Sequence, residues 1–308
     1  MTQGYASPFY TASYSEFGEP THFPVSGAQF LRRQINTELH DFTGVYPFVT
    51  AKDWPALAGE LEDLRTEGAV SAVFVTDPFA SDNIATLEGT LDVLRKFKCH
   101  YVVDLSGDWR SAIRKTTRQY ARRGLASGSF RIRDAQPSDA STFWALYQMS
   151  IERHGMVGLQ AMSLSTIENQ LAVPGALIAE LESDAEIVCQ MIMYRSGNIL
   201  YPHLQGIKPI GYKNFASYAI FQGVLNWAAS EGFAFVNLGG VAGMDQDPND
   251  GLAIFKRGFS NDTRWTYLAG KILDHDIYRY LTKERPPSGF FPAYRNLANA
   301  LPTAAEPS

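Results

Sequence analysis

The feature that most constrains the fold is a group of three apolar runs that lie close together in the sequence. They span residues 176–183, 186–195 and 198–207. The turn-forming residues Ser183-Asp184 and Ser196-Gly197-Asn198 separate them. Strands joined by such short connections are antiparallel neighbours, because parallel strands need a crossover of roughly a dozen residues or more. The sequence therefore predicts a three-stranded antiparallel meander.

Helices and further strands are predicted on both sides of this meander. A strand at 129–135 precedes it, followed by a helix that opens at Pro137-Ser138-Asp139. A helix from about residue 214 to 231, ended by Gly232, follows the meander and leads to a strand at 233–240. The last expected elements are strands at 253–260 and 263–270 and a helix at 274–281. This is the element order of an acetyltransferase-type (GNAT) domain, here over about 128–275.

A shorter alternation of helices and strands is predicted before residue 110. Asp53 is expected to cap a helix that ends near Gly68, and a strand follows at 71–77. A second helix, over about 81–94, and a strand at 100–106 complete the pattern. This alternation fits a degenerate second copy of the same domain, although the sequence contains no repeat that proves duplication. The fold class is therefore α/β, with a mixed central sheet flanked by helices.

Length and composition indicate a folded chain of two domains or one duplicated architecture. The chain has 308 residues, more than one compact domain usually holds. It is 45% hydrophobic and 19% charged, as globular proteins are. The first residues lack the basic and apolar segments of a secretory leader, and no stretch approaches the roughly 18 apolar residues that cross a bilayer. We therefore expect a cytoplasmic protein without integral membrane association.

No metal and no resident cofactor are expected. Cys99 and Cys189 lie in apolar, strand-like stretches without Cys/His ligand spacing, which favours buried free thiols. The acidic loop 245–250 superficially resembles a calcium-binding loop. Pro248 and the lack of a correctly spaced glycine and closing glutamate argue against calcium.

Positive charge is concentrated in one segment. Residues 1–109 hold 7 Lys and Arg against 15 Asp and Glu, whereas 110–133 hold eight basic residues and no acidic one. The net charge of -5 argues against a DNA partner. Arg110, Arg114 and Arg118 recur at helical i, i+4 spacing, so like charges would repel on one face of a helix at 110–127. Two interpretations stay open: a solvated face balanced by the acidic N-terminal part, or a phosphate-binding face.

Four stretches together resemble a known family. They are 104–124, 143–155, 214–240 with its LGG ending, and GLAIFKRGF at 251–259. The chain resembles the FemAB/FemX-like and BioF2-like acyltransferases, which carry two GNAT-type domains in tandem. The resemblance implies amide formation by attack of an amine on an activated acyl group, without a covalent enzyme intermediate. It divides the chain into a degenerate domain at 1–109, a basic linker helix at 110–127, an acyltransferase domain at 128–283 and an extension at 284–308.

The resemblance leaves the acyl donor open. The resemblance implies either aminoacyl-tRNA, the donor of FemAB-like relatives, or an acyl thioester, the alternative donor for BioF2-like relatives. A coenzyme A-binding GNAT domain carries a Q/R-x-x-G-x-G/A loop after its fourth strand. The equivalent segment, 206–214, has lost this spacing, and Pro209 removes an amide donor. Transfer of an amino acid from aminoacyl-tRNA to a small amine acceptor is therefore favoured, the acceptor being a peptide, a nucleotide-linked compound or a metabolite. The alternatives are an acyl-CoA- or acyl-carrier-dependent N-acyltransferase of an amino sugar or amino acid, and an inactive ligand-binding GNAT-like module.

Candidate catalytic residues are Lys256, His203 and Tyr201. The resemblance assigns Lys256, in the FK motif, to the reacting carbonyl oxygen or to a donor phosphate. In the fourth strand, Tyr201, His203 and Gln205 alternate onto what strand periodicity predicts to be one face. Such a polar face suggests a cleft, and Pro202 is expected to splay the strand from its neighbour. For His203, a hydrogen-bonded core histidine is an equally good interpretation.

Candidate substrate-binding residues come from three segments. The basic segment supplies anion contacts, the loop after the fourth strand supplies donor contacts, and the LGG strand end permits close backbone approach. The full set is Arg110, Arg114, Lys115, Arg118, Gln205, Tyr212, Lys213, Asn214, Asn237, Gly239 and Gly240.

Overall fold

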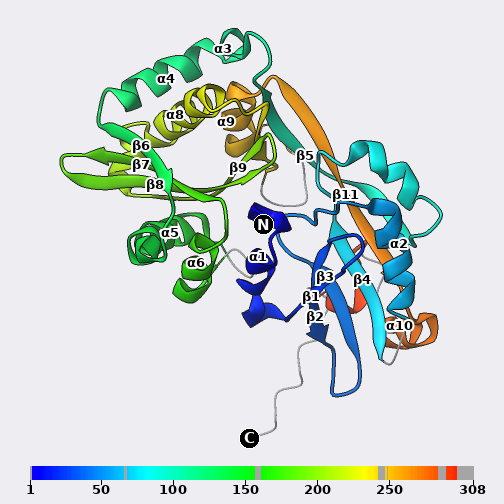
Figure 1. The fold of residues 1–308 in the computed structure, drawn as a ribbon. Helices are drawn as coiled ribbons and strands as arrows, with labels where there is room; N and C mark the ends of the chain where they lie inside the picture. Colours follow the sequence, from blue (N-terminus) through cyan, green and yellow to red (C-terminus); the bar gives the residue numbers. More distant parts are fainter. Residues whose placement is uncertain are drawn as a thin grey trace, which may run out of the picture. The chain divides into compact units, whose positions relative to one another are not determined.

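The computed structural model describes residues 2–65, 68–156, 161–241, 247, 249–283 and 289–296. Within these ranges it has a mixed α/β fold with one eleven-stranded sheet (Figure 1). The strands are β1 Glu19–His22, β2 Gln29–Gln34, β3 His40–Gly44, β4 Ala69–Val75, β5 Val93–Asp104, β6 Ser129–Asp134, β7 Ala176–Ser183, β8 Glu186–Ser196, β9 Ile199–Ile207, β10 Phe235–Gly239 and β11 Asp262–Ile272. Their order in the sheet is β1-β2-β3-β4-β11-β5-β10-β9-β8-β7-β6.

The α-helices of the described ranges vary from one turn to four. They are α1 Pro8–Ala12, α2 Trp54–Asp63, α3 Trp109–Ala112, α4 Lys115–Leu125, α5 Ala140–His154, α6 Leu164–Leu171, α7 Pro209–Lys213, α8 Ala216–Ser230, α9 Gly251–Phe259 and α10 His275–Thr282. None of the helices in the described part of the chain is long and apolar enough to cross a membrane. The predicted α/β class with a mixed sheet is confirmed.

Two compact units share the chain. The large unit comprises residues 1–14 and 98–266, and the small unit comprises 15–97 and 267–308. The chain passes between the units after residue 14 and again within the long strands β5 and β11. These bounds differ from a division at residue 109, because the first 14 residues pack in the large unit and the last strand is shared. The domain bounds expected from the sequence, at residues 109, 127 and 283, stay a prediction.

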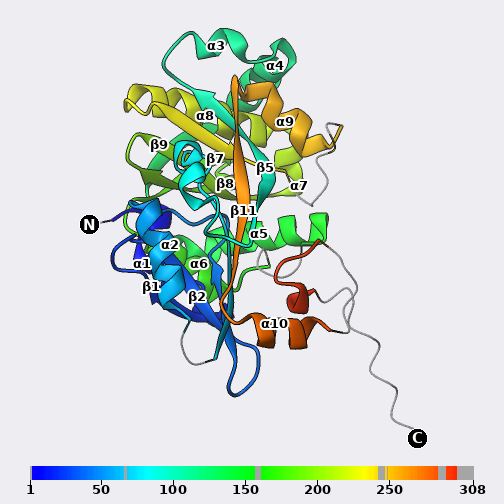
Figure 2. The same ribbon diagram turned by 90° about the vertical axis from the view of Figure 1, so that its right-hand side faces the viewer.

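The large unit is built on the meander that the sequence predicts. β7 and β8 are antiparallel, with Ala176 opposite Tyr194, and β8 and β9 are antiparallel, with Cys189 opposite Ile207. Helix α8 covers one face of these strands and α5 covers the other (Figures 1 and 2). On the α5 side the backbones approach closely, since a Cβ added at Gly206 would lie 2.7 Å from the Leu146 Cβ. The predicted meander is therefore confirmed.

The small unit has a separate apolar core beneath α2. β2 and β3 are antiparallel, β3 and β4 are parallel, and β4 and β11 are antiparallel. Phe23 and Phe30 stack with ring centroids 4.7 Å apart, and Trp54 and Leu57 of α2 are buried in the same cluster. Alternating apolar residues on short strands thus form a core that is distinct from the one beneath α8.

The expected second helix over 81–94 is wrong. Residues Ser81–Leu87 form a 3-10 helix, and β5 already begins at Val93. Gly89 lies between them with φ of +80°, a left-handed conformation that ends helices. Leu94 therefore belongs to a strand, although its spacing from the preceding leucines is helical.

The expected strand over 253–260 is also wrong, because these residues belong to helix α9. The side chain of Asp250 caps the helix by accepting hydrogen bonds from the Leu252 and Ala253 amides, at 2.9 and 3.0 Å. Phe255 and Phe259, four residues apart, then pack together with ring centroids 5.4 Å apart. The FK motif therefore lies on a helix.

The basic segment does not form one continuous helix. Ile113 is extended (ψ 127°) and buried, and it separates α3 from α4. The Arg114 amide donates to the Gly258 carbonyl oxygen at 2.9 Å instead of continuing the helix of α3. Arg110 therefore does not lie on the helix that carries Arg118, and the expected unbroken stripe is wrong.

Candidate functional site

The candidate site lies at the carboxyl end of β10. β9 and β10 pair in parallel only at Ile199–Phe235 and Leu200–Val236. Beyond these two positions β9 pairs only with β8, so the two strands diverge. The predicted splay of strand 198–207 is confirmed. Beyond Leu200 and Val236, the backbone amide and carbonyl groups of β9 and β10 do not hydrogen-bond to one another.

The end of β10 turns sharply. A register shift between Asn237 and Gly239 interrupts the pairing of β10 with β5. Gly239 has φ of +78°, in the left-handed region that favours glycine. The Asn237 Oδ1 accepts a hydrogen bond from the Gly239 amide at 2.9 Å. Asn237, Gly239 and Gly240 thus form one local turn.

Lys256 reaches this turn from α9. Its Nζ donates a hydrogen bond to the Gly240 carbonyl oxygen at 2.5 Å. Burial, followed by the positive charge of Lys98, lowers the pKa of Lys256 to about 7, whereas Asp250 acts in the opposite direction. Lys256 therefore exchanges its proton near neutral pH, which suits a group that stabilises charge or transfers a proton.

Two further residues of this cluster come from β5 and were not predicted. The Lys98 Nζ donates to the Val241 carbonyl oxygen at 3.1 Å, and the His100 Nδ1 lies 3.2 Å from the Asn237 Oδ1. Burial, with the charges of Lys256 and Lys98, lowers the pKa of His100 to about 3. Lys98 and His100 alternate in a strand, which is the signal that could have identified them.

The register places the polar residues of β9 and β10 on the same face where the strands diverge. Leu200 and Val236 are paired, and both belong to the core that α8 covers. Because successive side chains of a strand point to opposite faces, Tyr201 and Asn237 point away from α8. Val102 pairs with Asn237, so His100 of β5 shares this face.

His203 lies in an aromatic cluster rather than in an alternating polar row. A register shift in β9 leaves Tyr201 and Leu204 on one face and makes His203 the extra residue of a bulge. Its Nδ1 lies 3.0 Å from the Tyr5 hydroxyl, and its Nε2 lies 3.3 Å from the Gln170 Oε1. Burial lowers its pKa to about 3. This geometry favours the core-histidine interpretation.

Gln205 points to the opposite face, so the prediction that it shares a face with Tyr201 and His203 is wrong. Its Nε2 lies 3.2 Å from the Cys189 Sγ, and its Oε1 accepts from the Ser217 hydroxyl at 3.4 Å. The bulge at His203 causes the inversion, since one extra residue reverses the alternation beyond it.

Tyr201 is buried, with its ring in edge contact with Tyr5.

The remaining donor-loop candidates lie on α7 and its end. The Tyr212 hydroxyl lies 3.1 Å from the His154 Nε2, and the Arg153 guanidinium lies 4.2 Å from the centre of the Tyr212 ring. Lys213 is exposed in the last turn of α7, and Asn214 is its C-cap. These residues therefore interact with the end of α5 and with α7 itself, rather than with the turn that holds Lys256.

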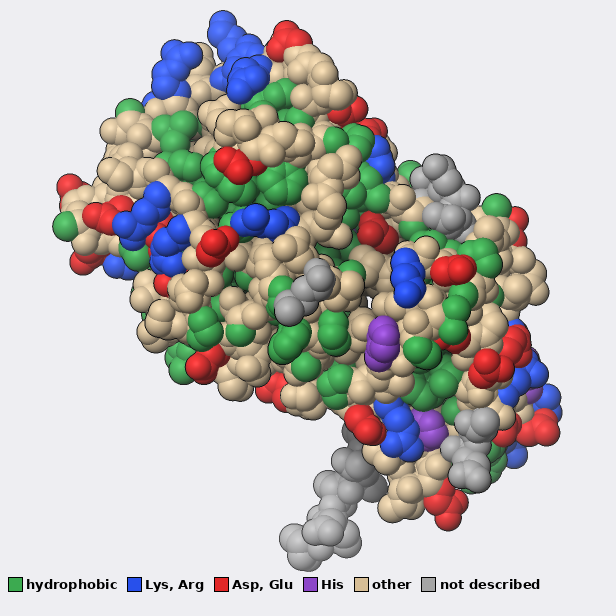
Figure 3. All heavy atoms as spheres, viewed as in Figure 1, with side chains coloured by type: hydrophobic (Ala, Val, Ile, Leu, Met, Phe, Trp, Pro, Cys, Tyr) green, Lys and Arg blue, Asp and Glu red, His purple; other side chains and the backbone are tan. Residues whose placement is uncertain are grey.

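The basic residues Arg110, Arg114, Lys115 and Arg118 are exposed on α3, α4 and the connection between them. Figure 3 shows Lys and Arg side chains gathered over these helices. The Arg118 guanidinium donates to the carbonyl oxygens of Arg110 and Ser111, at 3.1 and 3.3 Å. Among the described residues none of these four side chains forms an ion pair.

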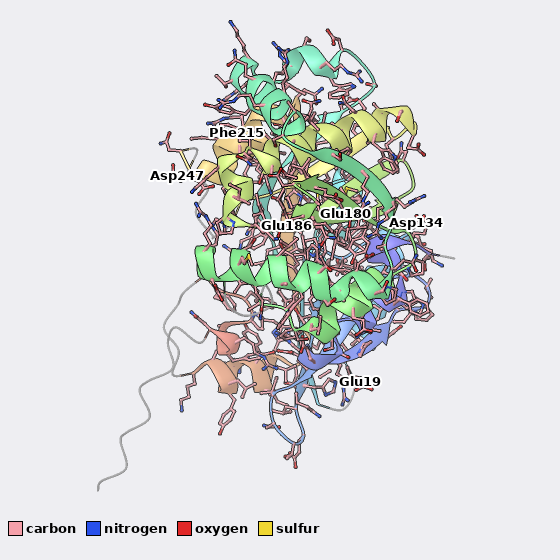
Figure 4. All side chains as sticks on the ribbon, turned by 90° about the vertical axis from the view of Figure 1, so that its left-hand side faces the viewer. Glu19, Asp134, Glu180, Glu186, Phe215 and Asp247 are labelled. Carbon is pink, nitrogen blue, oxygen red and sulfur yellow. The ribbon has the colours of Figure 1, made fainter. Side chains whose placement is uncertain are left out.

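Arg123 continues this surface into an aromatic contact. Phe215, labelled in Figure 4, lies between α4 and α8. Tyr120 stacks on its ring with centroids 4.6 Å apart, and the Arg123 guanidinium lies 4.7 Å from the ring centre. Helix α4 is therefore packed against the start of α8. We use the name basic surface for Arg110, Arg114, Lys115, Arg118, Arg122 and Arg123.

Metal binding finds no support in the described part of the chain. No cluster of three or more His, Cys, Asp or Glu side chains there could hold an ion. In the acidic loop 245–250, residues 245, 246 and 248 lie outside the described residues. Burial raises the pKa of the Cys189 thiol to about 12, so this thiol stays protonated at neutral pH.

Solved structures share this architecture at low sequence identity. No family model and no curated protein matches the sequence. A crystal structure of FemX has a TM-score of 0.66 at 12% identity, covering 88% of this chain and 92% of its own. The C-terminal domain of a putative lysylphosphatidylglycerol synthetase from Agrobacterium fabrum has a TM-score of 0.57 at 18% identity, covering 87% and 88%. For L-PGS from Bacillus licheniformis the TM-score is 0.54 at 18% identity, covering 86% and 92%.

These similarities define the class of fold. The diverging strands β9 and β10, the meander and the flanking helices form a GNAT fold. Within that class the chain has a FemX-like tandem GNAT fold. At such low identity the comparison establishes the fold alone, and the reaction must be argued from the site.

Proposed function

We propose that this protein transfers an amino acid from aminoacyl-tRNA to the amine of a small acceptor. The observation that carries the proposal is the turn at the end of β10, where Lys256 has its pKa lowered to about 7 beside diverging strands. The basic surface supports a donor that carries phosphates. The FemX-like fold supports the transferase class.

The proposed reaction needs no covalent enzyme intermediate. The acceptor amine attacks the ester carbonyl carbon of the aminoacyl group, forming a C–N bond and a negatively charged oxygen. The C–O bond to the tRNA ribose then breaks, and the amine loses a proton as the ribose hydroxyl gains one. The enzyme must align the reactants and stabilise the negative oxygen.

Lys256 is the proposed donor to this oxygen. Lys256 is half-buried as a residue, and burial is the main cause of its lowered pKa, so its charge acts through a medium of lower dielectric than water. In the structure it donates to the Gly240 carbonyl oxygen, a position from which it could turn to a substrate oxygen. Gly239 leaves room for the ammonium, since a Cβ there would lie 3.3 Å from the Lys256 Nζ.

The basic surface is the proposed binding site for the tRNA backbone. Six exposed cations without ion-pair partners in the described ranges would repel one another unless an anion neutralises them. Arg118 is already ordered by two backbone carbonyl groups, which lowers the entropy cost of holding a phosphate.

The coenzyme A alternative finds less support in the loop after β9. Gly206 packs against α5, and a Cβ at Gly211 would lie 3.0 Å from the Val188 carbonyl oxygen. Both glycines therefore serve packing within the fold. Residues Pro209–Lys213 form helix α7 where a pyrophosphate-binding loop would be needed.

A donor-binding comparison tests this proposal. Fluorescence-detected binding of aminoacyl-tRNA and of coenzyme A would be measured for the wild type at matched ionic strength. We expect tighter binding of the tRNA, with affinity that falls as salt is added. Tight, salt-insensitive binding of coenzyme A with no binding of tRNA would refute the proposed donor and favour the acyl-CoA alternative.

A further inference from the structure

We infer that His100 is a positioning residue that, through Asn237, fixes the turn whose Gly240 carbonyl holds the Lys256 ammonium. The inference deepens the proposed function and rests on it for the role of Lys256. His100 lies on β5, far from Lys256 in sequence, and no sequence pattern assigned it a role. Hydrogen bonds and close packing connect the imidazole to the ammonium.

The hydrogen bonds of Asn237 fix the tautomer of His100. The Asn237 Oδ1 accepts from the Gly239 amide, which can only donate. The atom facing the His100 Nδ1, 3.2 Å away, is therefore an acceptor. Nδ1 must carry the proton, so His100 is held as the Nδ1–H tautomer.

Asn237 also links the imidazole to the turn. Its side chain holds two donors at once, one from β5 and one from its own turn. Gly239 needs its left-handed conformation to complete that turn. The next residue, Gly240, packs against the imidazole, since a Cβ there would lie 3.3 Å from the His100 Cδ2. The position of the Gly240 carbonyl thus depends on the ring.

Burial, with the positive charges of Lys256 and Lys98, keeps the His100 imidazole neutral. The charged groups that act on Lys256 itself are Lys98 of β5, which lowers its pKa, and Asp250 at the start of α9, which raises it. Burial and the two lysines lower the pKa of His100 to about 3, so the ring is neutral across the working range. His100 can therefore orient Asn237 without adding a third positive charge to the site.

A matched pair of substitutions tests the inference. In His100→Asn the amide nitrogen occupies the place of Nδ1 and can still donate to Asn237. His100→Leu has a similar size and cannot donate. We expect His100→Leu to lower kcat of aminoacyl transfer by about tenfold or more, with KM little changed, because misplacing a reacting group is costly. His100→Asn should restore most of the rate.

A double-mutant cycle separates positioning from plain stabilisation. If His100 acts through Asn237, His100→Leu should have little further effect on kcat in an Asn237→Ala background. Additive losses in kcat, or wild-type transfer by His100→Leu, would overturn the inference. Thermal unfolding of each variant identifies a loss that comes from misfolding, and His100→Asn keeps the test valid if His100→Leu fails to fold.

A second measurement needs no substrate. The Lys256 amine can be titrated by NMR in isotope-labelled protein, with Lys256→Met used to assign its signal. The Gly240 carbonyl favours the ammonium form, so His100→Leu should lower the pKa of Lys256 while His100→Asn leaves it near the wild-type value. Equal pKa values in all three proteins would contradict positioning. Wild-type protein that shows the predicted titration but no transfer from aminoacyl-tRNA would instead refute the proposed function.

Discussion

Burial lowers the pKa of Lys256, His100 and His203, but the consequence for their charge at neutral pH differs. Lys256 has its pKa lowered to about 7, so both of its protonation states are populated near neutral pH. His100 and His203 have theirs lowered to about 3, so both stay neutral. Of these three residues, Lys256 is the one whose charge changes near neutral pH.

Replacing Lys256 should affect the rate and the pH dependence together. We expect Lys256→Met to lower the single-turnover rate of transfer by about a hundredfold, as when one preorganised donor is lost. If the ammonium is the active form, wild-type rates fall as pH rises through about 7, because the proton is then lost. This basic limb should vanish in Lys256→Met. Full activity of that variant would show that the FK motif has no role in the reaction.

His203 should make folding stability depend on pH in acid. Its pKa in the folded protein, about 3, is below the value of about 6.5 in the unfolded chain. Between these values the unfolded chain binds more protons, so stability is lost as pH falls below about 6.5. His203→Gln keeps a donor toward Gln170 and should flatten this decline. Chemical denaturation at several pH values measures it, and an equal slope in both proteins would contradict the burial argument.

At the scale of elements, the basic surface depends on the break between α3 and α4. Ile113 enters the core and the Arg114 amide turns to Gly258. Arg118 then caps the carbonyl groups of α3. Helical periodicity correctly indicated a helix in this segment but could not reveal the break, because the competing hydrogen bond comes from α9, more than a hundred residues later.

Substitutions of arginines on α4 and at its start should weaken tRNA binding without changing thermal stability. Arg114→Ala and Arg118→Ala should weaken tRNA binding and reduce its salt slope by about one for each phosphate that is no longer neutralised. Arg279→Ala, at an exposed arginine of α10, is the control and should leave the slope unchanged. All three variants should melt within a few degrees of the wild type. The same affinity and slope in every protein would mean that the surface is merely solvated.

A buried carboxylate ties the segment Ala293–Arg295 to β3 in the small unit. Asp41 is fully buried and accepts hydrogen bonds from Arg33, Arg295 and the Tyr294 hydroxyl. Asp41→Asn leaves the two guanidinium groups without a counter-charge, which should cost about 3–5 kcal/mol of unfolding free energy. Glu19→Gln, at an exposed ion pair, should have almost no effect. Urea denaturation of both variants checks the contrast.

For the whole molecule, the predictable part of the structure is the part that local pattern determines. The meander, α8 and the splayed strand follow from alternation, turn residues and a proline. The bulge at His203 was not predictable, since strand periodicity gives no sign of one extra residue. Placing Gln205 on the wrong face was the direct consequence.

The sequence predicted some residues of the candidate site and missed others. Asn237, Gly239, Gly240 and Lys256 were candidates, and the first three form one turn to which Lys256 donates. Their partners on β5 were missed because sheet pairing joins residues more than a hundred positions apart. In this sheet β5 lies between β11 and β10, which are distant in the sequence, so the spacing of nearby residues does not predict which strands are neighbours.

The most direct test of the central claim follows an amino acid from donor to product. Aminoacyl-tRNA carrying a labelled amino acid would be mixed with the enzyme and a fraction of small amines. The label would then be measured as alkali-stable amide, because the ester to tRNA is alkali-labile. We expect amide to form with the wild type and about a hundred times more slowly with Lys256→Met. Label that stays on tRNA, while an acyl-CoA donor yields amide under the same conditions, would contradict the account.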